Sequence, residues 1–321
     1  MKRTTIPALS IGLLTLLAAG CTDETAAPTA IANEARGVGE HGGGIPGSIV
    51  FVSERDAFPG EMGEIYAMNA DGSSVTRLTF ALPADDAWPA WSPNGKRIVF
   101  ASDRSGDREI WAMNSDGTEL VRLTHSAGPD AGGVYSPNGK QIAFHSRRDG
   151  NFELYVMDAD GENPTRLTDH PGSDLWPDWS PNGKQIAFQR GFQGNEDIYV
   201  LDLRTGEERR LTDHRAPDRM PVFSPNGKQI VFMSGREGYC SIFVMDATGE
   251  NLVNLTPKPA GVPAGSWCNF WPSWSRNGQQ IYFASERPGT ADVDVFVMNA
   301  DGTGVRQLTN APGWDYAPVA R

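Results

Sequence analysis

The sequence has little of what marks several large classes of protein. Only 21% of its 321 residues are charged, and 40 acidic residues against 28 basic ones give a formal net charge of −12. An acidic chain without a basic stripe does not suit the phosphate backbone, so no nucleic-acid partner is expected. There are three cysteines, and no Gly-x-Ser-x-Gly motif is present to expose a nucleophilic serine. We therefore expect no catalytic residues, no metal and no cofactor.

Long apolar runs are also scarce, apart from one stretch that follows the basic residues Lys2 and Arg3. This stretch is too short for a comfortable membrane span, and residues 1–21 read as a secretory signal segment. Its end, Leu-Leu-Ala-Ala-Gly-Cys, resembles a bacterial lipobox, although Ala18 stands where leucine is commonest. The resemblance implies that Cys21 is lipid-modified and becomes the mature N-terminus. The alternative is an ordinary signal peptide that happens to end near a cysteine.

The segment after Cys21 has no periodic pattern. Residues 22–46 contain almost no large apolar side chain, so we expect a flexible tether. Thr22 follows the cysteine, and by resemblance to enterobacterial lipoprotein sorting this favours the outer membrane, facing the periplasm. The lipid anchor is then the only expected contact with a membrane, and residues 47–321 form one folded domain that we expect to be monomeric.

Glycine and proline are plentiful, with 36 and 23 residues, and they punctuate an internal repeat. Ser-Pro-Asn-Gly recurs with its serine at 92, 136, 180 and 224, a spacing of 44, and Ser-Arg-Asn-Gly begins at 275. An apolar strand follows each turn, and then come an alternating strand and a short strand that ends in Leu-Thr. The Leu-Thr pairs begin at Leu78, Leu123, Leu167, Leu211, Leu255 and Leu308.

Short β-branched and aromatic runs bounded by Asn-Gly and Asp-Gly predict hairpins, because glycine accepts a positive φ at no steric cost. Four such strands per unit, at a period of 40–45 residues, indicate a propeller blade. The chain enters at the second strand of a blade and leaves after a first strand. We therefore predict an all-β, six-bladed propeller, closed by N-terminal strands together with one C-terminal inner strand.

The repeat resembles the β-propeller repeat of TolB and related periplasmic proteins. The shared pattern is Pro-x-Trp-Ser-Pro-[Asp/Asn]-Gly-Lys-x-Ile-x-Phe-x-Ser-x-Arg, then Ile-Tyr-x-Met-[Asn/Asp]-x-Asp-Gly, then Arg-Leu-Thr, and it covers residues 47–321. TolB has an α/β domain before its propeller, whereas in this chain we expect only the tether. The resemblance implies a TolB-like propeller lipoprotein whose partner is a protein of the cell envelope.

A polar position recurs three residues before the proline of each inner strand. It predicts a ring of five carboxylates and one amide around the mouth of the central channel, at Asp86, Asp130, Asp174, Asp218, Asn269 and Asp315. Such a ring suits a cation or a basic segment of a partner. The alternative is a structural role, in which each side chain caps a turn or pairs with the arginine that ends the second strand.

The arginine pattern is broken in two blades. Phe192 holds the arginine position of the fourth blade, so Asp174 is expected to have no obvious partner, and Arg287 faces Asn269 in the sixth. If any part of the ring binds a ligand, this sector is the candidate.

The same sector holds a seven-residue insertion. Cys240 and Cys268 lie in neighbouring loops, and in an oxidising compartment we expect them to form a disulfide; the alternative is two separate buried thiols. Four aromatic residues in or near this sector are expected to be exposed and suited to peptide or sugar contact. They are Trp176, Trp267, Phe270 and Trp271. The alternative for Trp176 and Trp271, which lie beside a proline, is that they wedge between blades.

The function expected from these features is non-catalytic binding by a preformed face in the cell envelope. One alternative is a carbohydrate-active enzyme similar to the oligogalacturonate lyases, which are propellers with histidine-bound metal. His125, His170 and His214 follow Leu-Thr in three blades, although solvated loop residues are the simpler interpretation. The other alternative is a sensor of glycans or small ligands that uses the loop from Trp267 to Trp271.

Overall fold

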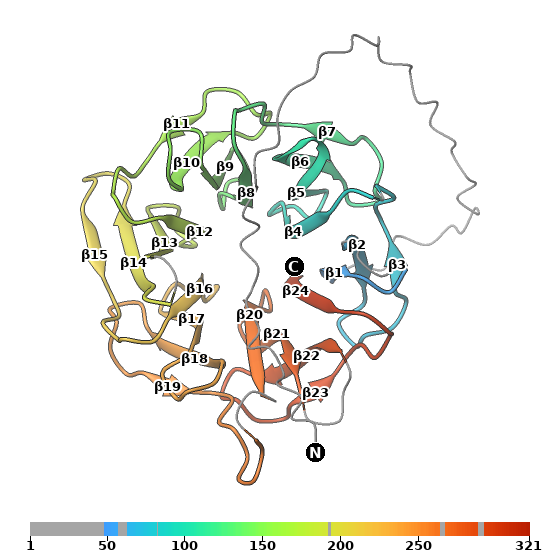
Figure 1. Ribbon diagram of the computed structural model, residues 1–321, viewed down its shortest axis with the longest axis vertical. Helices are drawn as coiled ribbons and strands as arrows, with labels where there is room; N and C mark the ends of the chain where they lie inside the picture. The colour runs from blue at the N-terminus through green and yellow to red at the C-terminus, as the bar shows by residue number, and fades with distance from the viewer. Residues whose placement is uncertain (1–47, 57–62, 82, 192–193, 264–266, 288–291) are drawn as a thin grey trace, which may run out of the picture. The chain divides into compact units, whose positions relative to one another are not determined.

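The computed structural model describes residues 48–56, 63–81, 83–191, 194–263, 267–287 and 292–321. In these residues every regular element is a strand, and the strands form six four-stranded antiparallel sheets arranged around a central axis (Figure 1). The predicted all-β, six-bladed propeller is therefore confirmed. The predicted signal segment, Cys21, the tether and Phe192 lie outside the described residues.

The four strands of a blade follow one another from the central axis outwards. Blade one has β24 (Asp315–Ala320), β1 (Ile49–Ser53), β2 (Glu64–Met68) and β3 (Thr76–Arg77). Blade two has β4 (Asp86–Trp91), β5 (Arg97–Ser105), β6 (Asp107–Asn114) and β7 (Val121–Arg122). Blade three has β8 (Asp130–Tyr135), β9 (Gln141–Ser146), β10 (Glu153–Asp158) and β11 (Thr165–Arg166).

The other three blades repeat this order. Blade four has β12 (Asp174–Trp179), β13 (Gln185–Arg190), β14 (Asp197–Asp202) and β15 (Glu208–Arg210). Blade five has β16 (Asp218–Phe223), β17 (Gln229–Ser234), β18 (Ser241–Asp246) and β19 (Val253–Asn254). Blade six has β20 (Cys268–Trp274), β21 (Gln280–Glu286), β22 (Val293–Asn299) and β23 (Arg306–Gln307).

The ring closes within blade one. The C-terminal strand β24 pairs with β1, and Ile49 lies opposite Ala320. The two ends of the propeller therefore share one sheet, as the sequence predicted (Figure 1). Closure of this kind leaves no open sheet edge between the first and last blades.

The Ser-Pro-Asn-Gly block is a self-contained turn. In blade two the Ser92 hydroxyl accepts a hydrogen bond from the Arg97 amide at 2.9 Å, and the Asn94 carboxamide oxygen accepts one from the Lys96 amide at 2.9 Å. Gly95 has a φ of 67°, which glycine adopts without strain. The block recurs because each blade needs the same reversal.

The Leu-Thr ending completes the short outer strand. In blade two the Thr124 hydroxyl accepts a hydrogen bond from the Ile110 amide at 2.9 Å and donates one to Glu109 at 2.5 Å. Arg122 also donates to Glu109, which is fully buried. The Thr124 hydroxyl thus takes the place of the next backbone carbonyl in the sheet hydrogen bonds, beyond the end of the two-residue strand. The buried Glu109 carboxylate receives both of its hydrogen-bond donors from this short segment.

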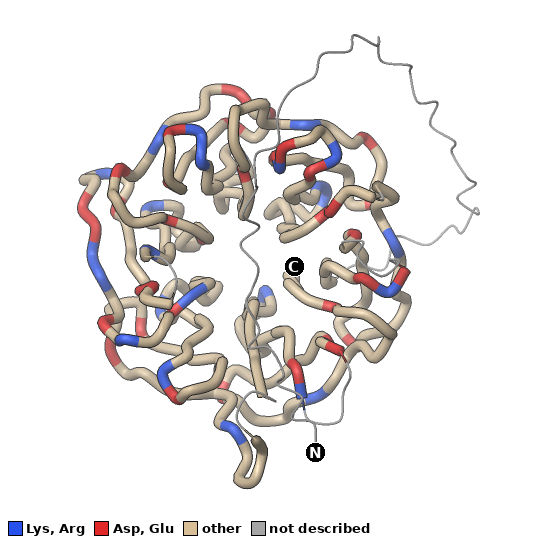
Figure 2. The backbone as a smooth tube through the Cα atoms, viewed as in Figure 1, with Lys and Arg blue, Asp and Glu red and all other residues tan. Residues whose placement is uncertain are grey.

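The hydrophobic core lies between neighbouring blades. Each second strand contributes one fully buried phenylalanine, and these are Phe51, Phe100, Phe144, Phe188, Phe232 and Phe283. Val99 and Ile110 of blade two pack in one cluster with Phe144 of blade three, and similar clusters join the other blades. Many charged residues lie on the outer strands and loops (Figure 2), and those of the inner strands are mainly the aspartates with which five of these strands begin.

Candidate functional site

In five of the six blades the ring residue forms an ion pair inside its own blade. All six side chains are fully buried. Four of these pairs have nitrogen–oxygen distances of 2.5 to 2.9 Å, and they are Arg104–Asp86, Arg148–Asp130, Arg236–Asp218 and Arg55–Asp315. Each of these arginines also donates through Nε to a serine hydroxyl of its own strand. The structural interpretation of the ring is therefore correct for these four blades.

The expectation that Asp174 lacks a partner is wrong. Arg190 lies directly opposite Asp174 in the sheet, where the other blades place a serine, and it forms a bidentate pair with both bonds at 2.7 Å. Arg190 also contacts Glu208 of the outer strand at 2.5 Å. Burial raises the pKa of Asp174 although Arg190 opposes that effect. The reason for placing a ligand at Asp174 is thus removed.

Blade six replaces the ion pair with neutral and aromatic contacts. The Ser285 hydroxyl donates to the Asn269 carboxamide oxygen at 2.8 Å. The Arg287 guanidinium lies over the rings of Trp267 and Phe296, at 4.6 and 4.3 Å from their centroids. Asn269 is thereby satisfied without a charge.

The predicted disulfide between Cys240 and Cys268 is present and joins blades five and six. The expectation of exposed aromatic residues beside it is wrong for two side chains. Trp267 and Phe270 are each only 7% exposed, because Phe270 packs against Met233, Ala284 and Val293, and the Trp267 indole donates to the Thr256 carbonyl. These two residues therefore belong to the core.

The histidines of the blade-to-blade loops lie in separate turns. The ring nitrogen Nδ1 of His170 accepts a hydrogen bond from Gly172, and that of His214 accepts one from Ala216. Within the described ranges no group of three or more histidine, cysteine, aspartate or glutamate side chains is placed to hold a metal ion.

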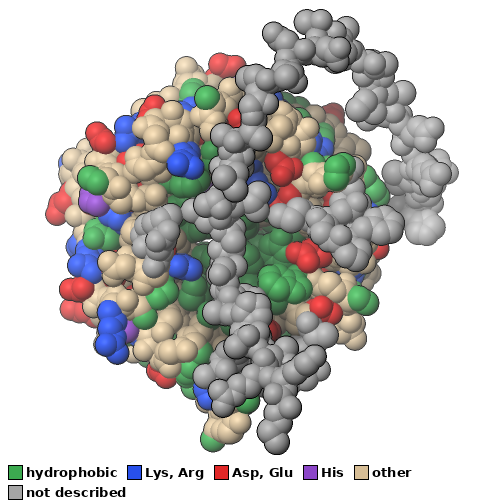
Figure 3. Space-filling model, in the orientation of Figure 1, with side chains coloured by type: hydrophobic (Ala, Val, Ile, Leu, Met, Phe, Trp, Pro, Cys, Tyr) green, Lys and Arg blue, Asp and Glu red, His purple; other side chains and the backbone are tan. Residues whose placement is uncertain are grey.

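Trp176 and Trp271 line a cavity on the central axis. Each inner strand contributes three residues to its wall, at positions 88–90, 132–134, 176–178, 220–222, 271–273 and 317–319. The cavity volume is about 140 Å³. Hydrophobic side chains gather around the centre of the face in Figure 3. A concave, largely apolar space with a few polar groups is the usual form of a small-molecule binding site.

A β-bulge in each inner strand builds this wall. The pairing shifts register between Ala87 and Ala90 of blade two, and a corresponding shift occurs in the other blades. The first residue of each triplet has a φ between 48° and 64°, and these residues are Trp88, Gly132, Trp176, Met220, Trp271 and Ala317. A left-handed conformation costs a non-glycine residue about 1–2 kcal/mol, so these strands are strained at the bulges. The bulges turn the side chains of the wall toward the cavity.

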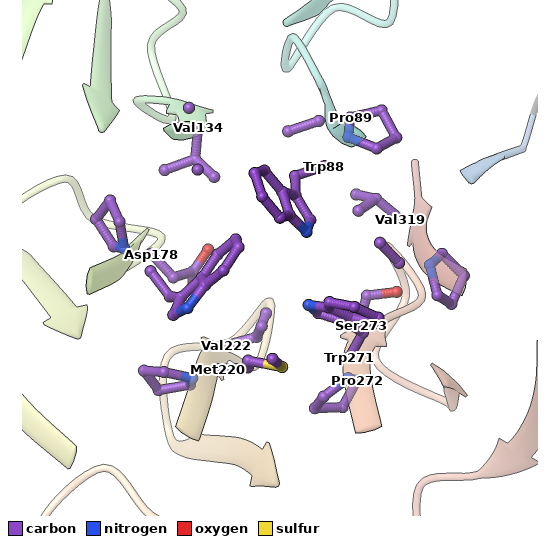
Figure 4. A pocket seen from close by; sticks show the side chains of 18 residues that line it. Trp88, Pro89, Val134, Asp178, Met220, Val222, Trp271, Pro272, Ser273 and Val319 are labelled. Atoms are coloured by element: carbon purple, nitrogen blue, oxygen red, sulfur yellow. The ribbon is translucent and has the colours of Figure 1, made fainter. Parts of the chain in front are cut away.

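The three tryptophans come from alternate blades. The rings of Trp88 and Trp176 meet edge to face, 5.0 Å apart, across blade three. Gly132 leaves room for the His145 and Trp176 rings, since a Cβ there would lie 2.7 Å from the first and 3.4 Å from the second. The indole nitrogens of Trp88 and Trp271 face the cavity (Figure 4), and no described residue accepts a hydrogen bond from either.

Asp178 is the single ionisable side chain among the described residues that line the cavity. The equivalent positions of the other blades hold Ala90, Val134, Val222, Ser273 and Val319. Its carboxylate accepts a hydrogen bond from the Phe223 amide at 2.7 Å, and among the described residues no lysine or arginine forms an ion pair with it. Burial raises the pKa of Asp178 to about 7. This residue was missed at the sequence level, although comparing the residue after each proline would have singled it out.

His145 supports the wall from behind. Its Nδ1 accepts the Trp176 amide at 3.4 Å, and its ring contacts the Trp176 ring edge to face at 5.1 Å. Burial, together with the charge of Arg108, lowers the pKa of His145 to about 3, so this histidine is neutral at physiological pH. Gln189 makes the corresponding bond to Met220 in the next blade.

The fold and the cavity together define a six-bladed propeller with an aromatic central site. Residues 167–268 match the model of the TolB beta propeller domain, and residues 105–193 match that of the Tricorn protease N-terminal beta propeller domain. The recognition of a TolB-like propeller is therefore confirmed. No curated protein sequence matches the chain.

Solved structures agree with this class. TolB from Acinetobacter baumannii is 26% identical with a TM-score of 0.73, over 86% of this chain and 68% of that one. A putative TolB from Agrobacterium tumefaciens is 22% identical with a TM-score of 0.64, over 85% and 98%. An oligogalacturonate lyase in complex with manganese is 15% identical with a TM-score of 0.54, over 82% and 74%, and this likeness concerns the fold alone. The described residues contain no helix of the length and apolarity needed to cross a membrane.

Proposed function

We propose that this protein is a non-catalytic binding protein of the bacterial cell envelope, which holds a protein partner at the mouth of its central cavity. The likeness to TolB propellers supports a protein-interaction role. A rigid ring of blades favours such a role, because a preformed surface loses little entropy on binding.

One observation carries the proposal. Each ring aspartate forms an ion pair inside its own blade, whereas Asp178 in the described cavity wall has no ion pair with a lysine or arginine. Two indole N–H groups without acceptors among the described residues face the same apolar space. Buried polar groups normally have partners. Where unpaired polar groups converge on an apolar cavity, a ligand can supply the missing hydrogen-bond acceptors and the missing cation.

The proposed location follows from the N-terminal segment. Cys21 would carry the lipid, residues 22–46 would serve as the tether, and the propeller would face the periplasm from the outer membrane. Incorporation of labelled fatty acid into the full chain, and its loss in Cys21→Ser, tests the anchor. Unchanged membrane fractionation of that variant would contradict it.

The binding role is tested by crosslinking followed by affinity capture from envelope fractions, with the lipid anchor intact. We expect Trp271→Ala to lose the captured partner. Trp111→Ala is the matched control, because it removes a half-buried tryptophan from β6, outside the cavity. Equal capture by wild type and Trp271→Ala would contradict the assignment of the site.

A further inference from the structure

The chemistry of the cavity wall restricts its ligand to a few kinds of group. Its volume of about 140 Å³ is close to the ~150 Å³ of an engineered apolar cavity that holds one benzene molecule. The space therefore takes one compact group, and any longer ligand would extend out of the cavity mouth. Most of the wall is proline, valine and indole, so a sugar would leave most of its hydroxyls without partners, at a cost of about 1–3 kcal/mol for each.

The charge of the wall favours a cation. Among the described lining residues Asp178 brings the only carboxylate, and its near neighbours on β8, β13 and β16 are apolar. His145 behind Trp176 is neutral, and Arg108, which lies 4.7 Å from the Trp88 ring, is paired with Asp85. Trp88 and Trp271 point their N–H edges into the cavity, so they offer hydrogen bonds there, and the attraction for a cation comes from the Asp178 carboxylate.

We propose that the cavity binds an alkylammonium group, enclosed by Trp88, Trp176 and Trp271 with Asp178 as its counter-ion. The two free indole N–H groups would donate to an acceptor on the same ligand, such as a hydroxyl or carbonyl oxygen. This proposal rests on the binding role proposed above and specifies its ligand. The ammonium group belongs either to a free small amine or to a lysine side chain of the partner.

Choline is a suitable probe because it carries a quaternary ammonium and a hydroxyl. Its neutral isostere, 3,3-dimethylbutan-1-ol, has the same shape without the charge, and N-acetyl-lysine N-methylamide represents the amine of a partner chain. Titration followed by tryptophan fluorescence, at ionic strength held constant with sodium chloride, compares the three. We expect the choline affinity to exceed that of the isostere by at least about tenfold, which is 1.4 kcal/mol.

The variant Asp178→Asn removes the charge and keeps an oxygen that can accept the Phe223 amide. We expect it to weaken choline binding about tenfold and to leave the isostere unchanged. Asp160→Asn, on an exposed hairpin turn, is the matched control and should bind as wild type does. Asp178→Ser gives a second test, because Ser273 occupies the equivalent position of blade six.

The pH dependence provides an independent readout. The pKa of Asp178 is about 7, so the carboxyl is neutral in acid and charged above neutrality. Choline affinity should rise between pH 6 and pH 8 in wild type and stay flat in Asp178→Asn.

Two results would overturn the ligand assignment: equal affinity for choline and its isostere, or choline binding that Asp178→Asn leaves unchanged. Binding of choline alone assigns the ammonium to a free amine, and comparable binding of the lysine derivative assigns it to a partner chain. If choline fails to bind while partner capture still requires Trp271, only the ligand assignment is wrong. If choline binds and no partner is captured, only the protein-binding role is wrong.

Discussion

The carboxylate ring and the cavity wall lie on the same inner strands and differ in every other respect. At the ring, nearly the same residue recurs in each blade, and each side chain finds its partner within its blade. Two residues further along each strand, the side chains differ from blade to blade, and the one carboxylate among the described wall residues has no ion pair with a lysine or arginine. In a repeat protein, the residues that recur in every blade serve the structure of each blade. A specific binding site therefore has to be built from residues that differ between blades.

The largest effect is expected from the ring. Arg190→Ser leaves the buried Asp174 without its partner, and breaking a buried ion pair costs about 3–5 kcal/mol. Urea unfolding measures the loss, with the exposed Lys184→Ala as control. The double variant Arg190→Ser/Phe192→Arg recreates the pattern of the other blades and should recover much of the stability. If Arg190→Ser were as stable as wild type, the ring would not be structural.

The disulfide should have the next largest effect. Cys240 and Cys268 are 28 residues apart, and the bond restricts the unfolded chain, which corresponds to about 2–4 kcal/mol. The double variant Cys240→Ser/Cys268→Ser should unfold at lower urea concentration, and reduced wild type should match it. An unfolding midpoint that is insensitive to reductant would contradict a stabilising role.

His145 links stability to pH behind the wall. Its pKa is lowered in the folded state, so the unfolded chain binds a proton first, and stability falls as pH drops below about 6.5. His145→Gln copies the residue of the next blade, and between pH 7 and pH 4 it should lose about 3 kcal/mol less stability than wild type. If the free energy of unfolding depended on pH equally in the two proteins, protonation of His145 would not destabilise the folded state.

Asp178 should show the opposite and smallest dependence. Its pKa is raised in the folded state, so its contribution to stability is present in acid and is lost as pH rises through about 7. Without ligand, the stability of Asp178→Asn relative to wild type should increase by about 2–3 kcal/mol between pH 5 and pH 8. Thermal unfolding at the two pH values, with Asp160→Asn as control, measures the difference. No gain would mean that water solvates this carboxylate in the cavity.

Much of the fold could be predicted from the sequence because the pattern of one blade recurs six times. The Asn-Gly turn at Gly95 and the Leu-Thr ending at Thr124 identify strands by local chemistry, and the incomplete first and last units predict the closure at β24. The four Arg–Asp pairs were also predictable, because the same spacing joins them in each blade.

The site was less predictable because bulges set the direction of its side chains. A left-handed residue at Trp88 or Trp271 turns an indole into the cavity, and simple alternation along a strand does not reveal this. The Arg190–Asp174 pair was not predicted because Arg190 occupies the position at which the other blades have a serine, two residues before the expected arginine. Trp267 and Phe270 were expected on the surface because the packing beneath the long loop is not periodic.

The central claim is that the partner is bound at the cavity and not at the repeated edges of the blades. Site-specific photo-crosslinking tests it most directly, with benzoylphenylalanine placed at Val319 in the wall, at Val121 on the exposed outer strand β7, or at Asp160 on an exposed turn. The account predicts that envelope extracts give a partner adduct at Val319 and none at the other two positions. An adduct at Val121 or Asp160 without one at Val319 would contradict it.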